Sequence, residues 1–205
     1  MVKVKICGIT SERDAAYALE AGADAIGLVF ARSPREVSVR KAARIAARVG
    51  PWTGVVGVFV NERPAVIRRI ARAVGLTAVQ LHGDETPADL KALRGIRRIK
   101  AFRISSPSDL EGSGAFDAEA YLFDTRLPNL YGGGGMVFDW GILKTRRFSR
   151  PVILSGGLGP GNVARAVRLL SPYGVDVSSG VERSPGKKDP KLIRKFVRNA
   201  KKYPA

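Results

Sequence analysis

The sequence predicts an α/β protein with the fold of a closed (β/α)8 barrel, and three observations support this fold class. Short apolar runs recur along the 205 residues, eight in all. The carboxyl ends of successive runs lie 21 to 31 residues apart, the length of one strand, one loop and one helix. Helix start and stop signals fall between the runs. Because these units use the whole chain, we expect residues 1–205 to form a single TIM-barrel domain.

The eight apolar runs predict the strands. They are continuous rather than alternating, as is typical of strands that are buried on both faces of a parallel sheet. An open, doubly wound sheet is the alternative, but that fold usually has fewer strands and lacks this regular count. The expected strands are Val2–Ile6, Ala25–Phe30, Val55–Val60, Ala78–Leu81, Ile99–Ile104, Ala120–Phe123, Val152–Leu154 and Val175–Val177.

Capping residues, prolines and glycines predict the helices. Ser11 and Asp14 form a capping-box pattern ahead of the helix-forming run Ala15–Leu19. The segment Ser105–Ala115 after the fifth strand carries the weakest helix signal, because it is rich in serine and glycine. Proline near the start, or glycine after the end, marks the other helices, which we expect over Ala65–Val74, Ala88–Leu93, Asn162–Leu170 and Lys191–Lys201.

Composition limits the cellular setting. No run of about 18 apolar residues exists, so we expect no transmembrane helix and no membrane partner. The N-terminus lacks the apolar core of a signal peptide, and a single cysteine cannot form an internal disulfide, so we expect a cytoplasmic protein. The chain has only one glutamine, four asparagines and two methionines, and this scarcity of heat-labile residues suggests a thermophile.

The net charge of +17 is the compositional outlier. Such a charge suits nucleic acid, an anionic membrane or small anionic substrates. Nucleic-acid binding is not expected as the main function, because no aromatic residues interleave with the basic ones to stack on bases. The arginines are instead scattered over several expected elements, as at Arg68, Arg69, Arg72, Arg94, Arg97 and Arg98.

Two reactive side chains follow expected strands directly. Cys7, the only cysteine, follows the first strand, and Asp124 follows the sixth. In a parallel barrel these strand ends converge on the face where active sites lie. Cys7 could instead be a small buried hydrophobe, and Asp124 a helix cap. An acid/base role is favoured for Asp124, because the residues after it look like a loop in which Gly132–Gly135 could form a flexible lid.

Other strand ends suggest an anion site. Gly156-Gly157 follows the seventh strand and Ser178–Gly180 the eighth, where barrels commonly bind phosphate through backbone amides. Arg35, after the second strand, could bind a carboxylate. His82, the only histidine, suits a structural hydrogen bond as well as catalysis. One histidine and one cysteine far apart in sequence predict no metal site, and no nucleotide-cofactor motif or serine triad is present.

Six motifs, in order and at barrel-strand spacing, resemble those of phosphoribosylanthranilate isomerases of tryptophan biosynthesis. The resemblance extends over nearly the whole chain. That family has the (β/α)8 fold and uses no cofactor, so the resemblance implies both here. The motifs are Lys5–Thr10, Gly57–Asn61, Gln80–Gly83, Asp124–Thr125, Ser155–Leu158 and Val175–Glu182.

The resemblance also assigns roles to individual residues. Cys7 would be the general base and Asp124 the general acid, and a strand end beside helix-terminal amides should favour the Cys7 thiolate. Arg35 would hold the anthranilate carboxylate, although Glu36 stands where many members carry a tyrosine. The remaining substrate-binding residues would be Gly156, Gly157, Asp176, Ser178, Ser179 and Gly180.

The implied reaction is the Amadori rearrangement of N-(5-phosphoribosyl)anthranilate to 1-(2-carboxyphenylamino)-1-deoxyribulose 5-phosphate. Three alternatives remain open. The related sugar isomerase of histidine biosynthesis carries an aspartate where this chain has Cys7. A barrel could also bind a phosphorylated ligand without turnover, and a basic protein could bind nucleic acid. The expected partner is the small-molecule substrate, and the oligomeric state is left open between monomer and homodimer.

Overall fold

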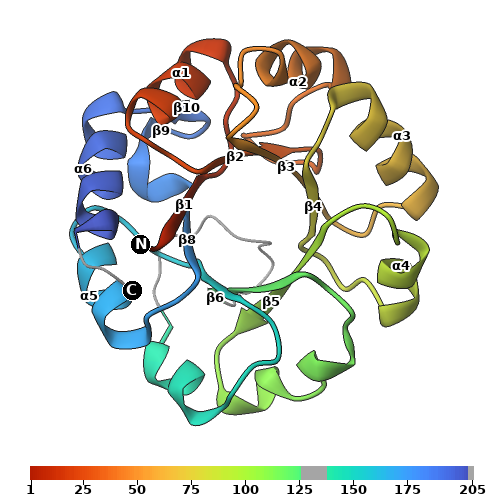
Figure 1. The fold of residues 1–205 in the computed structure, drawn as a ribbon, viewed down its shortest axis with the longest axis vertical. Helices are drawn as coiled ribbons and strands as arrows, with labels where there is room; N and C mark the ends of the chain where they lie inside the picture. The colour runs from red at the N-terminus through yellow and green to blue at the C-terminus, as the bar shows by residue number, and fades with distance from the viewer. Residues whose placement is uncertain (126–137, 203–205) are drawn as a thin grey trace.

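The eight predicted strands form one closed parallel barrel, shown in Figure 1. The structure is a computed structural model that describes residues 1–125 and 138–202. Pairing of the first strand with the eighth closes the barrel, which confirms the predicted fold and excludes the open sheet. The strands are β1 (Lys3–Ile6), β2 (Ala25–Val29), β3 (Gly54–Phe59), β4 (Ala78–Leu81), β5 (Arg98–Ile104), β6 (Ala120–Thr125), β7 (Val152–Leu154) and β8 (Gly174–Val177).

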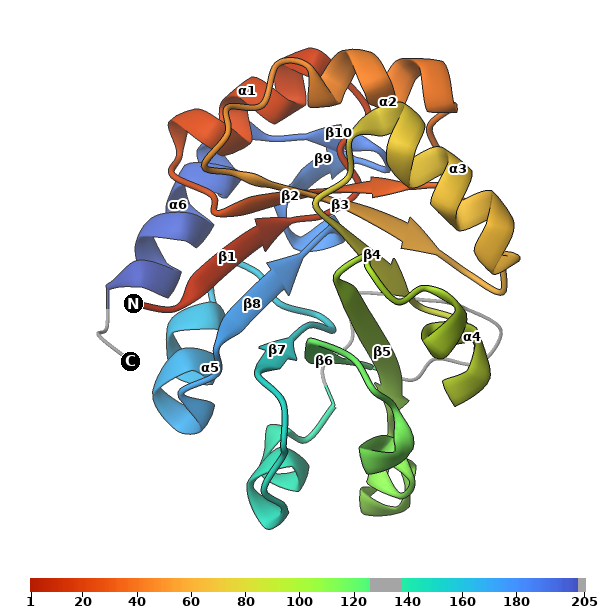
Figure 2. The same cartoon turned by 45° about the vertical axis from the view of Figure 1, so that its right-hand side comes forward.

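Helices surround the barrel on its outer side, as Figure 2 shows. Local capping explains where several begin. The Ser11 hydroxyl accepts the Asp14 N–H, and Thr86 forms a capping box with Asp89. The Asp189 carboxylate accepts two backbone N–H groups at the start of the last helix. The helices are α1 (Glu12–Glu20), α2 (Val39–Ala46), α3 (Pro64–Val74), α4 (Pro87–Ala92), α5 (Val163–Leu170) and α6 (Pro190–Lys201).

The fifth and sixth units differ from the others in the described part of the chain. The α-helix expected over Ser105–Ala115 is wrong: this segment forms two short 3-10 turns, η1 (Pro107–Leu110) and η2 (Ser113–Ala115). Between them Gly112 adopts a positive φ of 73°, which ends one turn before the next begins. After β6 another 3-10 turn, η3 (Trp140–Thr145), takes the place of a helix.

The barrel interior is apolar at one level and polar at another. Alternate residues of each strand point inward. Six of them form a separate apolar cluster, consisting of Val56, Ile99, Ala101, Ala120, Leu122 and Ile153. Inward positions nearer the carboxyl ends are polar and include Lys5, Gln80, Asp124 and Asp176, all buried. The sequence thus builds an apolar base under a polar mouth.

A hairpin that the sequence did not predict lies between β8 and α6. It consists of a 3-10 turn, η4 (Ser179–Val181), followed by β9 (Glu182–Ser184) and β10 (Lys187–Lys188). The Thr10 hydroxyl donates to the Gly186 carbonyl at 2.6 Å. This bond attaches the hairpin to the loop after β1, so the hairpin lies at the carboxyl face of the barrel.

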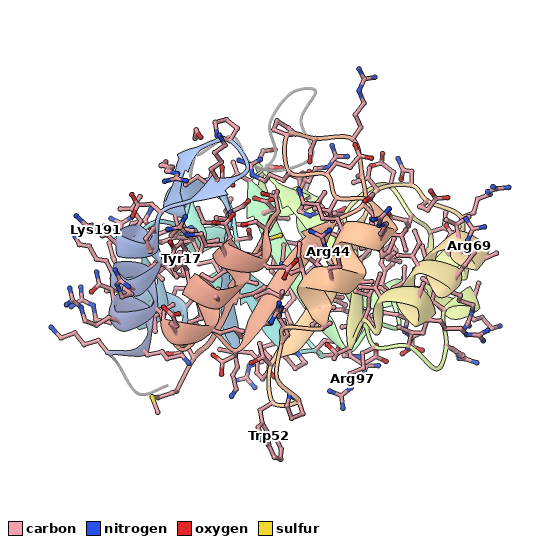
Figure 3. The ribbon with its side chains drawn as sticks, turned by 90° about the horizontal axis from the view of Figure 1, so that it is seen from above. Tyr17, Arg44, Trp52, Arg69, Arg97 and Lys191 are labelled. Atoms are coloured by element: carbon pink, nitrogen blue, oxygen red, sulfur yellow. The ribbon has the colours of Figure 1, made fainter. Side chains whose placement is uncertain are left out.

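The excess basic residues are distributed over the outside. Arg44, Arg69, Arg97 and Lys191 are exposed and come from different helices and loops around the barrel, as Figure 3 shows. Trp52 projects from the loop before β3, at the opposite end from the hairpin, and is 96% exposed. Within residues 1–125 and 138–202, the helices are too short or too polar to cross a bilayer.

Candidate active site

Cys7 lies directly after β1 and is buried in the barrel mouth. Its N–H donates to the Val177 carbonyl at 2.8 Å, which continues the β1–β8 pairing by one residue. Gly27 on β2 faces the thiol, and a side chain there would come within 2.7 Å of the Cys7 sulfur. The absence of a side chain at Gly27 therefore makes room for Cys7.

A buried ion pair lies beside this thiol. Lys5 is directly opposite Asp176 in the β1–β8 register, and its Nζ is 2.9 Å from the Asp176 Oδ1. Burial alone would lower the pKa of Lys5, but the charge of Asp176 and the contact with Cys7 outweigh it, so this pKa is raised. Lys5 therefore stays an ammonium next to Cys7.

Burial raises the pKa of the Cys7 thiol above its ordinary value. The charges of Lys5 and Lys188 oppose this rise, and the charge of Asp176 adds to it. Burial therefore disfavours the Cys7 thiolate, and the two nearby ammonium groups favour it. The raised pKa runs against the expectation that the strand end favours the thiolate, because desolvation outweighs the nearby ammonium groups.

Asp124 occupies the other reactive position, at the end of β6. Its Oδ1 accepts the Thr125 N–H at 2.8 Å. Its Oδ2 is 3.2 Å from the His82 Nε2, a close contact without the alignment of a good hydrogen bond. Cys7 and Asp124 are separated around the barrel by β7 and β8. The structure thus brings His82 to Asp124 rather than to Cys7.

Gln80 orients the His82 ring through a hydrogen bond. Its side-chain Nε2 is 2.8 Å from the His82 Nδ1. When the amide donates this bond, Nδ1 is the acceptor, so the neutral ring carries its proton on Nε2, facing Asp124. Sequence reasoning missed Gln80. The available signal was a polar amide inside an apolar strand, two residues before His82 and therefore on the same face.

The glycine loops after β7 and β8 enclose a cavity of about 370 Å³. Gly156 and Gly157 have φ values of 83° and 62°, which other residues rarely adopt. The Asn162 amide accepts the Gly159 N–H and donates to the Gly157 carbonyl, which fixes the first loop. The cavity is lined by Gly157, Leu158, Gly159, Gly161, Asn162, Ser179 and Gly180.

The remaining predicted phosphate residues lie beside this cavity rather than in its lining. Gly156 packs against Asp124 and Thr125. Ser178 is close to Gly8, and its Oγ is buried with no hydrogen-bond partner among the described residues. The cavity therefore brings together Gly157, Ser179 and Gly180 of the predicted set.

Arg35 is already paired. Its Nε and Nη2 donate to the two carboxylate oxygens of Glu182, both at 2.8 Å. Lys188 donates to the same carboxylate at 2.8 Å. Glu182 ends the Val175–Glu182 motif, but sequence reasoning gave it no role. Sequence reasoning also missed Lys188. The sequence signal for Lys188 was weak, because it consisted only of a position just before a helix cap.

Two expectations concern features beyond these contacts. The Gly132–Gly135 lid falls within residues 126–137, outside the described residues. Among residues 1–125 and 138–202, no three histidine, cysteine or acidic side chains gather as metal ligands would.

Comparison with known proteins gives consistent matches over nearly the whole chain. A family model described as N-(5'phosphoribosyl)anthranilate (PRA) isomerase matches residues 4–199. The N-(5'-phosphoribosyl)anthranilate isomerase of Trichlorobacter lovleyi is 47% identical over 205 residues, covering 98% of each chain.

Solved structures agree with this. The crystal structure of phosphoribosyl anthranilate isomerase from Thermotoga maritima is 44% identical, covers 99% of this chain and 100% of its own, and superposes with a TM-score of 0.92. A phosphoribosyl anthranilate isomerase in complex with reduced 1-(o-carboxyphenylamino)-1-deoxyribulose 5-phosphate is also 44% identical, with the same coverage and a TM-score of 0.88. By its fold, its sequence and these matches, the chain belongs to the N-(5'-phosphoribosyl)anthranilate isomerase family.

Proposed function

We propose that this chain catalyses the Amadori rearrangement of N-(5-phosphoribosyl)anthranilate to 1-(2-carboxyphenylamino)-1-deoxyribulose 5-phosphate in tryptophan biosynthesis. One observation carries the proposal. A buried thiol and a buried carboxylate stand in one barrel mouth, on either side of the two strands whose glycine loops line an open cavity of about 370 Å³. A solved family member bound to the reduced product supports the same assignment.

The reaction requires an acid and a base on one sugar. Asp124 in its protonated form donates to the ring oxygen as the C1–O bond breaks, and a Schiff base forms. The Cys7 thiolate removes the C2 proton to give an enolamine, which tautomerises to the aminoketose. The Thr125 N–H and the His82 ring then stabilise the carboxylate left on Asp124.

Two anionic groups of the substrate have matching sites. The phosphate enters the cavity between the loops after β7 and β8, where backbone N–H groups are available. Arg35 binds the anthranilate carboxylate. Asp176 acts through its ion pair with Lys5 at the floor of the mouth. The net charge of +17 attracts this anionic substrate.

Further features belong to the same proposal. The reaction needs no cofactor, residues 1–205 act as one catalytic domain, and the enzyme works in the cytoplasm on a small-molecule substrate. The composition supports a heat-adapted enzyme, so we expect a thermal melt above the ~45–65 °C typical of mesophile domains.

The direct test is turnover of freshly generated phosphoribosylanthranilate, followed as loss of anthranilate fluorescence. We expect conversion by the wild type and competitive inhibition by inorganic phosphate. The aminoaldose substrate of the histidine pathway is assayed in parallel. If the protein converted only that substrate, its function would be that of the histidine-pathway isomerase. If it bound a substrate tightly without converting it, its function would be ligand binding without catalysis.

A further inference from the structure

Three charged side chains from separate segments meet beside the candidate active site. Arg35 comes from the loop after β2, and Glu182 and Lys188 come from the β9–β10 hairpin. Gly8 makes the meeting possible, because a side chain there would come within 2.5 Å of the Arg35 Cδ. Gly8 also has a φ of 73°, which favours glycine.

The Glu182 carboxylate is fully engaged by the two cations. Its Oε1 accepts from the Arg35 Nε and from the Lys188 Nζ, and its Oε2 accepts from the Arg35 Nη2, all at 2.8 Å. Burial would raise the pKa of Glu182, but Arg35 and Lys188 outweigh it and lower this pKa, so the carboxylate is charged at neutral pH.

Lys188 is the most buried member of the cluster. Its side chain is 0% exposed, and its Nζ donates to the Ser178 carbonyl at 3.0 Å as well as to Glu182. Burial lowers its pKa from the ordinary lysine value, and Glu182 opposes that change. Lys188 therefore joins the Arg35–Glu182 pair to the first residue of the loop after β8.

The geometry defines which edge of the guanidinium is left for a ligand. Glu182 takes the Nε and Nη2 side, so Nη1 and the second Nη2 proton form the remaining donor edge. That edge fits a second carboxylate in a two-bond pair. With two cations and one anion, the cluster carries a net charge of +1, which matches one further carboxylate.

We propose that Glu182 and Lys188 are positioning residues that hold Arg35 as an end-on clamp for the carboxylate of the substrate's aromatic amine. They thereby set the preference for carboxylated over uncharged aromatic amines. This inference rests on the proposed isomerase function. A free arginine side chain loses rotamer entropy when it is fixed. Because Glu182 fixes Arg35 before the substrate arrives, substrate binding does not carry this entropy cost.

The two partners act differently. Glu182 aims the guanidinium, and without it Arg35 would have no fixed edge to present. Lys188 offsets the charge of Glu182, and without it the cluster would be neutral and would attract a carboxylate less strongly. Both effects concern binding. The charge of Lys188 also lowers the pKa of Cys7, but this effect is the same for substrates with and without the carboxylate.

The test compares kcat/KM for phosphoribosylanthranilate with that for phosphoribosylaniline, which lacks the carboxylate. Glu182→Gln and Lys188→Met should each reduce the preference for the carboxylated substrate on the order of tenfold, about 1.4 kcal/mol. For Glu182→Gln the change should appear in KM, with kcat for both substrates retained. Lys188→Met also removes a charge that lowers the pKa of Cys7, so it should slow both substrates alike, and the ratio between them reports the clamp. Glu12→Gln is the matched control, because it removes a carboxylate that pairs with Arg44 and Arg48 on the outer helices.

Folding is checked by circular dichroism, because Glu182→Gln leaves Lys188 buried without its anion. If that variant does not fold, the clamp is tested with Lys188→Met and with the double variant that combines Glu182→Gln and Lys188→Met. Neither of these leaves a buried lysine without its anion. An unchanged preference in any folded variant overturns the clamp. If the wild type converts neither substrate, the proposed function fails. The clamp is then judged by calorimetric binding of the reduced product against its decarboxylated counterpart.

Discussion

The two sides of the barrel mouth surround their reactive groups with different chemistry. On the β1–β8 side, Cys7 touches a buried ion pair formed by Lys5 and Asp176. On the β4–β6 side, Asp124 meets a backbone N–H and the His82 ring, which is oriented by the Gln80 amide. One reactive group lies beside a buried ion pair, and the other contacts a backbone N–H and an imidazole ring.

This difference matches what an acid and a base each need. A base must lose its proton before it acts, and a neighbouring ammonium stabilises the thiolate once that has happened. An acid must keep its proton until it acts, and a fixed cation would oppose this. Cys7 and Asp124 thus lie in different electrostatic surroundings, as the proposed pair of base and acid would.

The strongest test removes both reactive groups in turn. Cys7→Ala and Asp124→Asn should each lower kcat by ~10²–10⁴-fold, the usual contribution of a positioned acid or base. Neither change deletes a large apolar group, so circular dichroism should show folded proteins. The double variant should be little worse than the worse single variant, because the two act in one sequence.

A fully active Cys7→Ala protein would return the cysteine to the role of a small buried hydrophobe. Additive losses in the double variant would contradict a shared proton-transfer sequence.

A smaller effect tests the charged side alone. Removing the ammonium with Lys5→Met should raise the pKa of Cys7 further, and removing the carboxylate with Asp176→Asn should lower it. Because the proposed mechanism uses the Cys7 thiolate, we expect the acidic limb of the pH–rate profile to move to higher pH in the first variant and to lower pH in the second. If the pKa of Cys7 moves by about one, the thiolate fraction on that limb changes about tenfold.

Iodoacetamide gives the same pKa directly, since Cys7 is the only thiol in the chain. The double variant that combines Lys5→Met with Asp176→Asn leaves neither charge of the pair buried without its partner, so it serves as the folding control. Changes in the same direction for both single variants would show that burial, and not the ion pair, governs Cys7.

The smallest effect tests the neutral side. Gln80→Leu removes the donor to the His82 Nδ1, so the ring should populate both neutral tautomers instead of one. We expect kcat to fall by roughly tenfold, about 1.4 kcal/mol, with KM nearly unchanged. Nitrogen NMR reports the tautomer without ambiguity, because His82 is the only histidine. If the wild-type His82 ring carried its proton on Nδ1, that would contradict the assigned hydrogen bond from Gln80 to His82.

Local signals were sufficient to predict the barrel. Buried parallel strands are continuous apolar runs, and prolines or capping residues mark the helices between them, so strand limits differ from those observed by only a residue or two. Local signals failed at Ser105–Ala115, where serine, proline and glycine support turns but no α-helix.

The site was predictable only in part, for a physical reason. Cys7 and Asp124 stand at strand ends, which the strand pattern locates. Lys5 and Gln80 lie two residues before Cys7 and His82, so strand spacing places each on the same face as its neighbour. The contacts of Lys5 with Asp176 and of His82 with Asp124 depend on pairing across the barrel, which sequence spacing does not reveal. A lysine inside a buried apolar strand was nevertheless an available signal, because such a charge is almost always paired. The engagement of Arg35 by Glu182 arises from residues 147 apart in the chain and had no local signal.

Closure of the barrel has a consequence for the nascent chain. β1 leaves the ribosome well before its partner β8, which is complete only at Val177. At ~5–20 residues per second, one edge of β1 waits roughly ten seconds or more without its neighbour. Lys201, which pairs with Asp24 near the start of the chain, is made later still. Cys7, at the end of β1, thus lies outside a finished pocket while the next seven strands are made, and the barrel mouth is complete only after β8 and the β9–β10 hairpin have followed.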